Sequence, residues 1–121
     1  MQRIDEQIQA DYTRDFLTIC FSHPAIKGFM IWGFWEGAHW LPRGAMYRRD
    51  FSEKPNGEAF RHLVHEVWQT NAQGRTDRDG RFAARAFYGR YDVTVTWRGQ
   101  TRTVSVDHVP GDRPTLVRVE F

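Results

Sequence analysis

Residues 28–40, GFMIWGFWEGAHW, decide how the first half of this chain is interpreted. The stretch opens on an apolar run and continues with three tryptophans, a carboxylate and an imidazole within nine residues. The apolar run predicts a short strand over 28–32, of the type that is buried on both faces. The tryptophan-rich part fits two interpretations. It is either a turn that packs in the core or a loop whose rings cover the apolar faces of a sugar.

Helical periodicity flanks this strand on both sides. Apolar residues with helical spacing predict a helix over 4–21, which Ser22-His23-Pro24 ends. A loop of about twenty residues follows the strand, and Asn56 is expected to cap a second helix over 57–69. The order helix, strand, loop, helix is typical of a parallel α/β fold. The two apolar stripes are Ile8, Tyr12, Phe16, Ile19 and Cys20, then Phe60, Leu63, Val64, Val67 and Trp68.

The second half of the chain has the alternation of β-strands. Two turn signals divide it, Asp79-Gly80 and Arg98-Gly99, and we interpret the first as a hairpin turn rather than a calcium loop. We therefore expect a small antiparallel sheet or sandwich of four or five strands over 71–121, joined to an α/β part over 1–70. The fold class is α+β. The predicted strands include 81–87, 91–97, 100–106 and 115–121.

Composition narrows the function classes. The chain has 121 residues, 40% hydrophobic and 26% charged, which is typical of a globular protein of one domain or two very small ones. The arginines are scattered, which argues against nucleic-acid binding. No apolar run reaches the length of a membrane span, and the charged start does not resemble a signal peptide. As written the chain would stay in the cytoplasm, although its localisation is unknown.

Two residue types bear on cofactors. Cys20 is the only cysteine, which excludes an internal disulfide and a cysteine zinc site, and we expect it to be buried and inert. His62 and His65 share one face of the second predicted helix, a spacing that can bind a metal. A solvated helix face explains them better, so we expect no metal site and no cofactor. His39 and His108 add ligands only if the fold brings them close.

The first seventy residues contain five separate motifs, in this order: Asp11–Leu17, Phe21–Pro24, Gly28–Gly37, Tyr47–Asp50 and Lys54–Gly57. Together they resemble the carboxy-terminal end of the family 10 glycoside hydrolases, which include the endo-1,4-β-xylanases. The resemblance runs from about residue 4 to 69, and residues 74–95 are similar to the small β extension of some members. It implies that 1–70 are the last units of a (β/α)₈ barrel, with 28–33 as its eighth strand.

The resemblance also implies a sugar site. Trp32 and Trp40 match the two tryptophans that line the family's site, and Glu36 lies where the family often has an acidic residue. Trp35 and His39 lie in the same loop and are further candidates. The implied ligand is a β-1,4-linked polysaccharide such as xylan.

The catalytic residues of the family have no counterpart here. Retaining glycosidases need two carboxylates about 5–5.5 Å apart, and the family carries them on strands four and seven. The resemblance therefore implies a xylanase-related fragment that is inactive alone and holds no catalytic residue. Two alternatives remain: a non-catalytic carbohydrate-binding or interaction module, and a small metal-dependent protein that acts on polysaccharides.

An isolated parallel strand raises a question of assembly. The predicted strand 28–33 has two unpaired edges, and exposed apolar edges recruit other strands. Either this strand joins the sheet of the β module, or two chains pair through their strands into a symmetric homo-oligomer.

Overall fold

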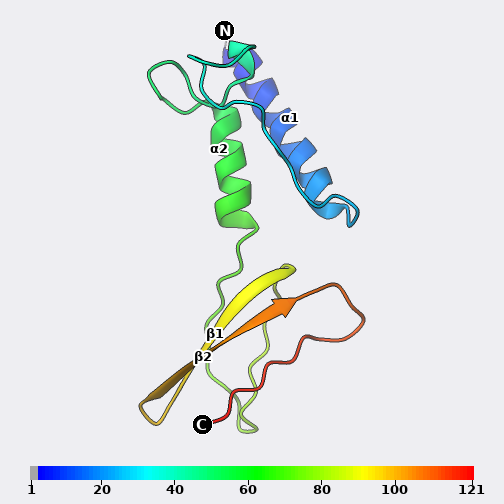
Figure 1. Ribbon diagram of the computed structural model, residues 1–121, viewed down its shortest axis with the longest axis vertical. Coiled ribbons are helices and arrows are strands. Elements are labelled where there is room, and N and C mark those ends of the chain that lie inside the picture. The colour runs from blue at the N-terminus through cyan, green and yellow to red at the C-terminus, as the bar shows by residue number, and fades with distance from the viewer. Residues whose placement is uncertain (1–2) are drawn as a thin grey trace. The chain divides into compact units, whose positions relative to one another are not determined.

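The computed structural model describes residues 3–121, and the chain divides into two compact units, Met1–Gln69 and Thr70–Phe121. The first unit contains the helices, and the second contains a two-stranded antiparallel sheet (Figure 1). The predicted α+β class is confirmed. None of the helices in the described part of the chain combines the length and hydropathy of a membrane span.

Helix α1, Arg3–Ser22, confirms the first predicted helix. Two acidic residues in its first turn favour the helix amino terminus. Ala10 and Leu17 are buried, and α1 packs along the second helix (Figure 1). The predicted apolar stripe is instead largely exposed: Ile8 and Ile19 are each 63% accessible. Cys20, expected to be buried, is a half-buried free thiol.

Helix α2, Pro55–His62, begins two residues before the predicted start. Lys54 is its N-cap and Pro55 its first residue, a position where the missing N–H and fixed φ of proline are favourable. Asn56 is therefore not the cap. It lies inside the first turn, where it is buried and its Nδ2 lies 3.5 Å from the carbonyl of Ala45.

A π-helical turn, Leu63–Val67, continues α2. Its signature is the 2.9 Å bond from the Trp68 amide to the Leu63 carbonyl, five residues back. The wider turn places the Trp68 ring against Phe21 at the end of α1, with centroids 4.1 Å apart and planes 6° from parallel. Trp68 thereby joins the two helices at their far ends, while Val67 of the predicted stripe is exposed.

The sequence predicts a buried strand over 28–32, and this prediction is wrong. These residues form no ladder, and Met30 is 87% exposed. A parallel strand obtains its hydrogen bonds from neighbouring strands, and residues 3–121 offer it none. The hairpin of the second unit pairs only with itself, so the alternative in which this strand joins that sheet is also wrong.

Strands β1, Gly89–Trp97, and β2, Gln100–His108, confirm the predicted hairpin and extend it. Trp97 pairs with Gln100 across a two-residue turn. On one face of the ladder three polar pairs hydrogen-bond across the strands at 2.6–2.9 Å. The opposite face carries the valines and aromatic residues that sequence alternation places there.

Residues 81–87 and 115–121 do not form the predicted strands, so the described sheet has two strands rather than four or five. Alternating hydrophobicity is compatible with a strand, but a ladder also needs a partner edge in register. Residues 77–80 form a turn, as expected, but the turn joins no two strands, so the hairpin predicted there is wrong. The Asp77 carboxylate accepts bonds from the Asp79 and Arg81 amides, each at 2.9 Å.

Candidate functional site

The tryptophan loop, residues 32–47, is closed by its own backbone. The amides of Met46 and Tyr47 both donate to the carbonyl of Phe34, at 2.9 and 2.8 Å. The Glu36 amide donates to the Tyr47 carbonyl at 3.0 Å. The amide of Lys54 then bonds the Met46 carbonyl at 2.8 Å, which fixes the loop to the start of α2. A loop held in this way presents its side chains in defined positions.

Trp32 and Trp40 are the two exposed tryptophans of this loop. They are 77% and 78% accessible, and neither ring stacks on another ring in the part of the chain that the structure describes. An exposed indole face is costly to leave in water and suits the apolar face of a pyranose. These two predicted site residues are therefore free to contact a ligand.

Trp35 is occupied within the loop. Its ring stacks on Phe51 with centroids 5.1 Å apart and planes 6° from parallel, and its Nε1 donates to the Arg49 carbonyl at 3.2 Å. A Cβ at Gly37 would overlap the indole, so the ring lies directly on that residue. Phe51 itself has a φ of 62°, in the left-handed region. Trp35 therefore shapes the loop.

Glu36 forms an ion pair with Lys54, whose side chain is 1% exposed. The Lys54 ammonium also lies 3.3 Å from the Pro42 carbonyl, so it joins both arms of the loop to the N-cap of α2. The hydrogen bond from Lys54 is the main reason that the pKa of Glu36 lies below its usual value. Sequence reasoning missed Lys54, because burial of a lysine is visible only with its partners in place.

His39 also has its side chain engaged. Its Nδ1 accepts the Leu41 amide at 2.9 Å, and the ring packs on Gly33 and Gly44. A Cβ on Gly33 would lie 2.8 Å from the imidazole Cδ2, and this glycine has a φ of 78°. His39 therefore closes the turn that carries Trp40.

The Glu36–Lys54 pair predicts a titration. The folded pKa of Glu36 is lowered, so the pair is complete above the unfolded value and is lost as the pH falls through the lower folded pKa. In an NMR titration of the side-chain carboxyls we expect the Glu36 midpoint below the ordinary glutamate value of about 4.3. A midpoint at or above that value would contradict the pairing. The Lys54→Met variant should move it upward.

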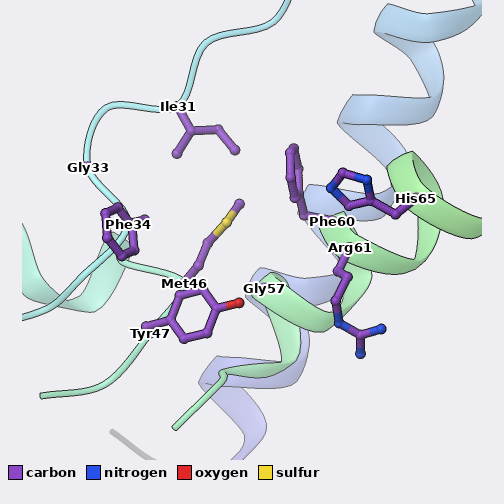
Figure 2. A pocket seen from close by; sticks show the side chains of 9 residues that line it. All are labelled: Ile31, Gly33, Phe34, Met46, Tyr47, Gly57, Phe60, Arg61 and His65. Atoms are coloured by element: carbon purple, nitrogen blue, oxygen red, sulfur yellow. The ribbon is translucent and has the colours of Figure 1, made fainter. Parts of the chain in front are cut away.

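A hollow of about 330 Å³ lies between residues 31–34 and α2, lined mostly by apolar side chains. Figure 2 shows Met46 and Phe60 pointing toward Ile31 across it. Arg61, at its edge, is paired with Glu53 and Glu66 and offers no free charge. The hollow marks where residues 28–32 stand away from α2, and its chemistry points to no ligand.

The two histidines of α2 and its π-helical turn contact different partners and do not form a common site. His62 Nδ1 lies 2.9 Å from Glu66 Oε2, and this contact is the main cause that lowers the pKa of Glu66. His65 instead faces the Phe60 ring, edge to face at 6.4 Å. Within residues 3–121 no group of three or more potential ligands could hold a metal ion.

Known proteins are similar to this chain over most of its length. The anti-sigma-I factor RsgI6 of Acetivibrio thermocellus is 37% identical over 119 residues, which is 95% of this chain and 16% of that protein. Endo-1,4-beta-xylanase 1 of Arabidopsis thaliana is 32% identical over 92 residues, 76% of this chain and 10% of that protein. Endo-1,4-beta-xylanase 2 of the same plant is 30% identical over 91 residues, 75% of this chain and 8% of that enzyme. No family model matches the chain.

The predicted resemblance to the endo-1,4-β-xylanases is thus confirmed, over a small part of their length. This chain spans about a sixth or less of these relatives. What the whole proteins do does not transfer directly to a segment of this size.

Proposed function

We propose that this relative of the family 10 endo-1,4-β-xylanases binds β-1,4-xylan through Trp32 and Trp40 of the tryptophan loop. The carrying observation is the exposure of these two rings, 77% and 78%, on a loop whose other candidate side chains are engaged. Stacking of pyranose faces on indoles is the expected mode of contact. The names of the Arabidopsis relatives make xylan the first polysaccharide to test.

The other candidates act on the loop in this proposal. Trp35 and His39 pack inside it, and Glu36 holds Lys54, so their side chains set the positions of the two exposed rings. Glu36 also retains acceptor capacity, because a carboxylate has about four lone-pair sites. A hydroxyl of a bound sugar is a suitable donor to the remaining sites.

We further propose that this chain binds xylan without hydrolysing it. Retaining hydrolysis needs a second carboxylate about 5–5.5 Å from the first. Glu36 is the one carboxylate of the tryptophan loop, and Lys54 holds it ionised, which makes it a poor proton donor to a leaving group. In this proposal residues 1–70 correspond to the last α/β units of the enzyme barrel and 71–121 to its β extension.

The test is binding of xylohexaose to the full chain by calorimetry. Trp32→Ala and Trp40→Ala are each expected to weaken binding about tenfold, because each removes one stacking face. Tyr12→Ala is the matched control, since its ring is 67% exposed on α1 and lies outside the loop. Equal affinity of the unsubstituted chain and all three variants would reject the site.

Mass spectrometry of xylan and cellulose after incubation with the chain tests the second claim. We expect no soluble oligosaccharides, with or without added metal and reductant. Neutral oligosaccharides would show hydrolysis and overturn the claim. Oxidised oligosaccharides that form only with metal would favour the alternative of a small metal-dependent protein that acts on polysaccharides.

A second candidate is recognition of polysaccharide as part of a regulatory protein. The observation that favours it is sequence identity over the whole chain: the anti-sigma-I factor is 37% identical over 95% of this chain, whereas endo-1,4-beta-xylanase 3 of Arabidopsis thaliana is 22% identical over 97% of it. Both candidates use the same rings. Binding that changes the chain's hydrogen exchange outside the tryptophan loop would favour the regulatory role, and exchange confined to the loop would not.

A further inference from the structure

The arginines of the second unit have no acidic partners. Residues 70–121 contain nine arginines against six aspartates and glutamates. Every ion pair of the described residues lies in the first unit, between residues 6 and 66. The guanidinium groups of the β unit are therefore not neutralised by its own carboxylates. Unpaired cations on one unit favour an anionic ligand.

Two of these arginines are held by aromatic rings at the tip of the hairpin. The Arg98 guanidinium lies 4.4 Å from the centre of the Trp97 ring, and that of Arg102 lies 5.6 Å from Phe121. The two rings are themselves 5.8 Å apart. We call these four residues the hairpin-tip cluster. A guanidinium that stacks on a ring keeps its N–H donors in its own plane, where they are open to a carboxylate.

The ladder explains why the cluster forms. Trp97 and Arg102 share one face, because Arg102 pairs with Val95, two residues from Trp97. Trp97 is 50% exposed, and both arginines are exposed. The cluster is thus accessible and has its rotamers partly fixed before any ligand binds.

The backbone at Arg98 is a second, independent sign. Arg98 has a φ of 48° and Gly99 a φ of 79°, as a two-residue type I′ turn requires. Asn-Gly is the preferred sequence there, and a long side chain is disfavoured at φ > 0. Strained non-glycine residues concentrate at functional sites. Arginine at this position strains the turn, and it places a guanidinium at the exposed tip of the hairpin.

We propose that the hairpin-tip cluster binds the carboxylates of a polysaccharide that bears uronic acids. Arg98 and Arg102 each offer the two parallel N–H groups that match a carboxylate. The choice of a sugar acid rests on the proposed function, since a xylan with uronic acid branches presents carboxylates beside a β-1,4 chain. In this proposal the hairpin-tip cluster selects acidic chains through its own contacts with their carboxylates.

A nucleic acid fits the cluster less well. Single-stranded bases need open aromatic faces, and Arg98 covers one face of Trp97 while Phe121 lies close to the ring. A carboxylate requires only the guanidinium edge. The arginines of residues 70–121 are also spread along the sequence rather than grouped in a basic run.

The test compares two polymers with one backbone: a xylan bearing glucuronic acid, and the same xylan after chemical reduction of its carboxyl groups. Arg98→Asn removes the charge without disturbing the turn, because Asn-Gly is the preferred sequence for a turn of this type. We expect the full chain to bind the acidic polymer about tenfold more tightly than the reduced one, and Arg98→Asn/Arg102→Gln to abolish that ratio. Arg75→Gln/Arg78→Gln, which removes the same charge from exposed arginines of the β unit, is the control and should keep it.

Each other outcome overturns the proposal. Equal affinity for both polymers, or equal loss in the control variant, would mean that the cluster does not recognise carboxylates. Binding of a DNA oligonucleotide as tightly as the acidic xylan, lost in Arg98→Asn, would assign the cluster to nucleic acid. Failure to bind either polymer would reject the proposed function together with this inference, whereas binding of both polymers alike rejects the inference alone.

Discussion

Lys54→Met is expected to lower the midpoint urea concentration of unfolding, because it removes the buried ammonium that pairs with Glu36. Methionine keeps the aliphatic volume at a position that is 1% exposed, so the loss reports the charge and not a cavity. The Pro42 carbonyl also loses the ammonium, and the two arms of the tryptophan loop lose their common anchor. Urea unfolding followed by tryptophan fluorescence measures this change.

Two further variants identify the cause. Lys54→Met/Glu36→Gln should recover part of the loss, because the neutral amide no longer requires a cation. Arg14→Met removes exposed pairs with Asp11 and Asp15 and should leave the unfolding midpoint almost unchanged. A Lys54→Met chain as stable as the original would show that the pair contributes nothing. Xylan affinity should fall in the Lys54→Met variant even where it remains folded, because the position of the Trp40 ring depends on the conformation of the tryptophan loop.

The elements that sequence reasoning predicted correctly are those with local causes. Helix α1 depends on residues three and four apart, and the β1–β2 hairpin depends on alternation and on the Arg98-Gly99 turn. Residues 28–32 have the composition of a buried strand, but their state depends on partner strands that residues 3–121 do not provide. The composition of these residues favours burial in a sheet, but only tertiary contacts with other strands can bury them.

The candidate site divides in the same way. The pattern of tryptophans located the loop, and the structure leaves the rings of Trp32 and Trp40 open. The ion pair of Glu36 could not be predicted from the sequence, because its partner Lys54 lies eighteen residues away. The two residues come close only when the loop closes on α2. Electrostatic partners at such separations follow from the fold and not from spacing. The arginines of the hairpin tip were likewise visible as residues but not as an unpaired cluster.

Gly57→Ala is expected to destabilise the first unit by about 2 kcal/mol, although alanine is the better helix former. An added Cβ would lie 2.9 Å from the Met46 carbonyl oxygen and 3.1 Å from the Glu53 Cγ. The Met46 carbonyl is itself fixed, because it accepts the Lys54 amide at 2.8 Å. The gain of about 1 kcal/mol from helix propensity is therefore smaller than the cost of moving the loop backbone.

A matched glycine separates propensity from packing. Gly28→Ala meets no atom within 4 Å, so it should leave stability unchanged or raise it by about 0.5 kcal/mol. If Gly57→Ala proves as stable as Gly28→Ala, α2 does not pack on the loop as the structure describes. If it is destabilised and also binds xylohexaose more weakly, then the contact between α2 and Met46 sets the loop that carries Trp40. Folding and sugar binding would then depend on the same close approach of helix and loop.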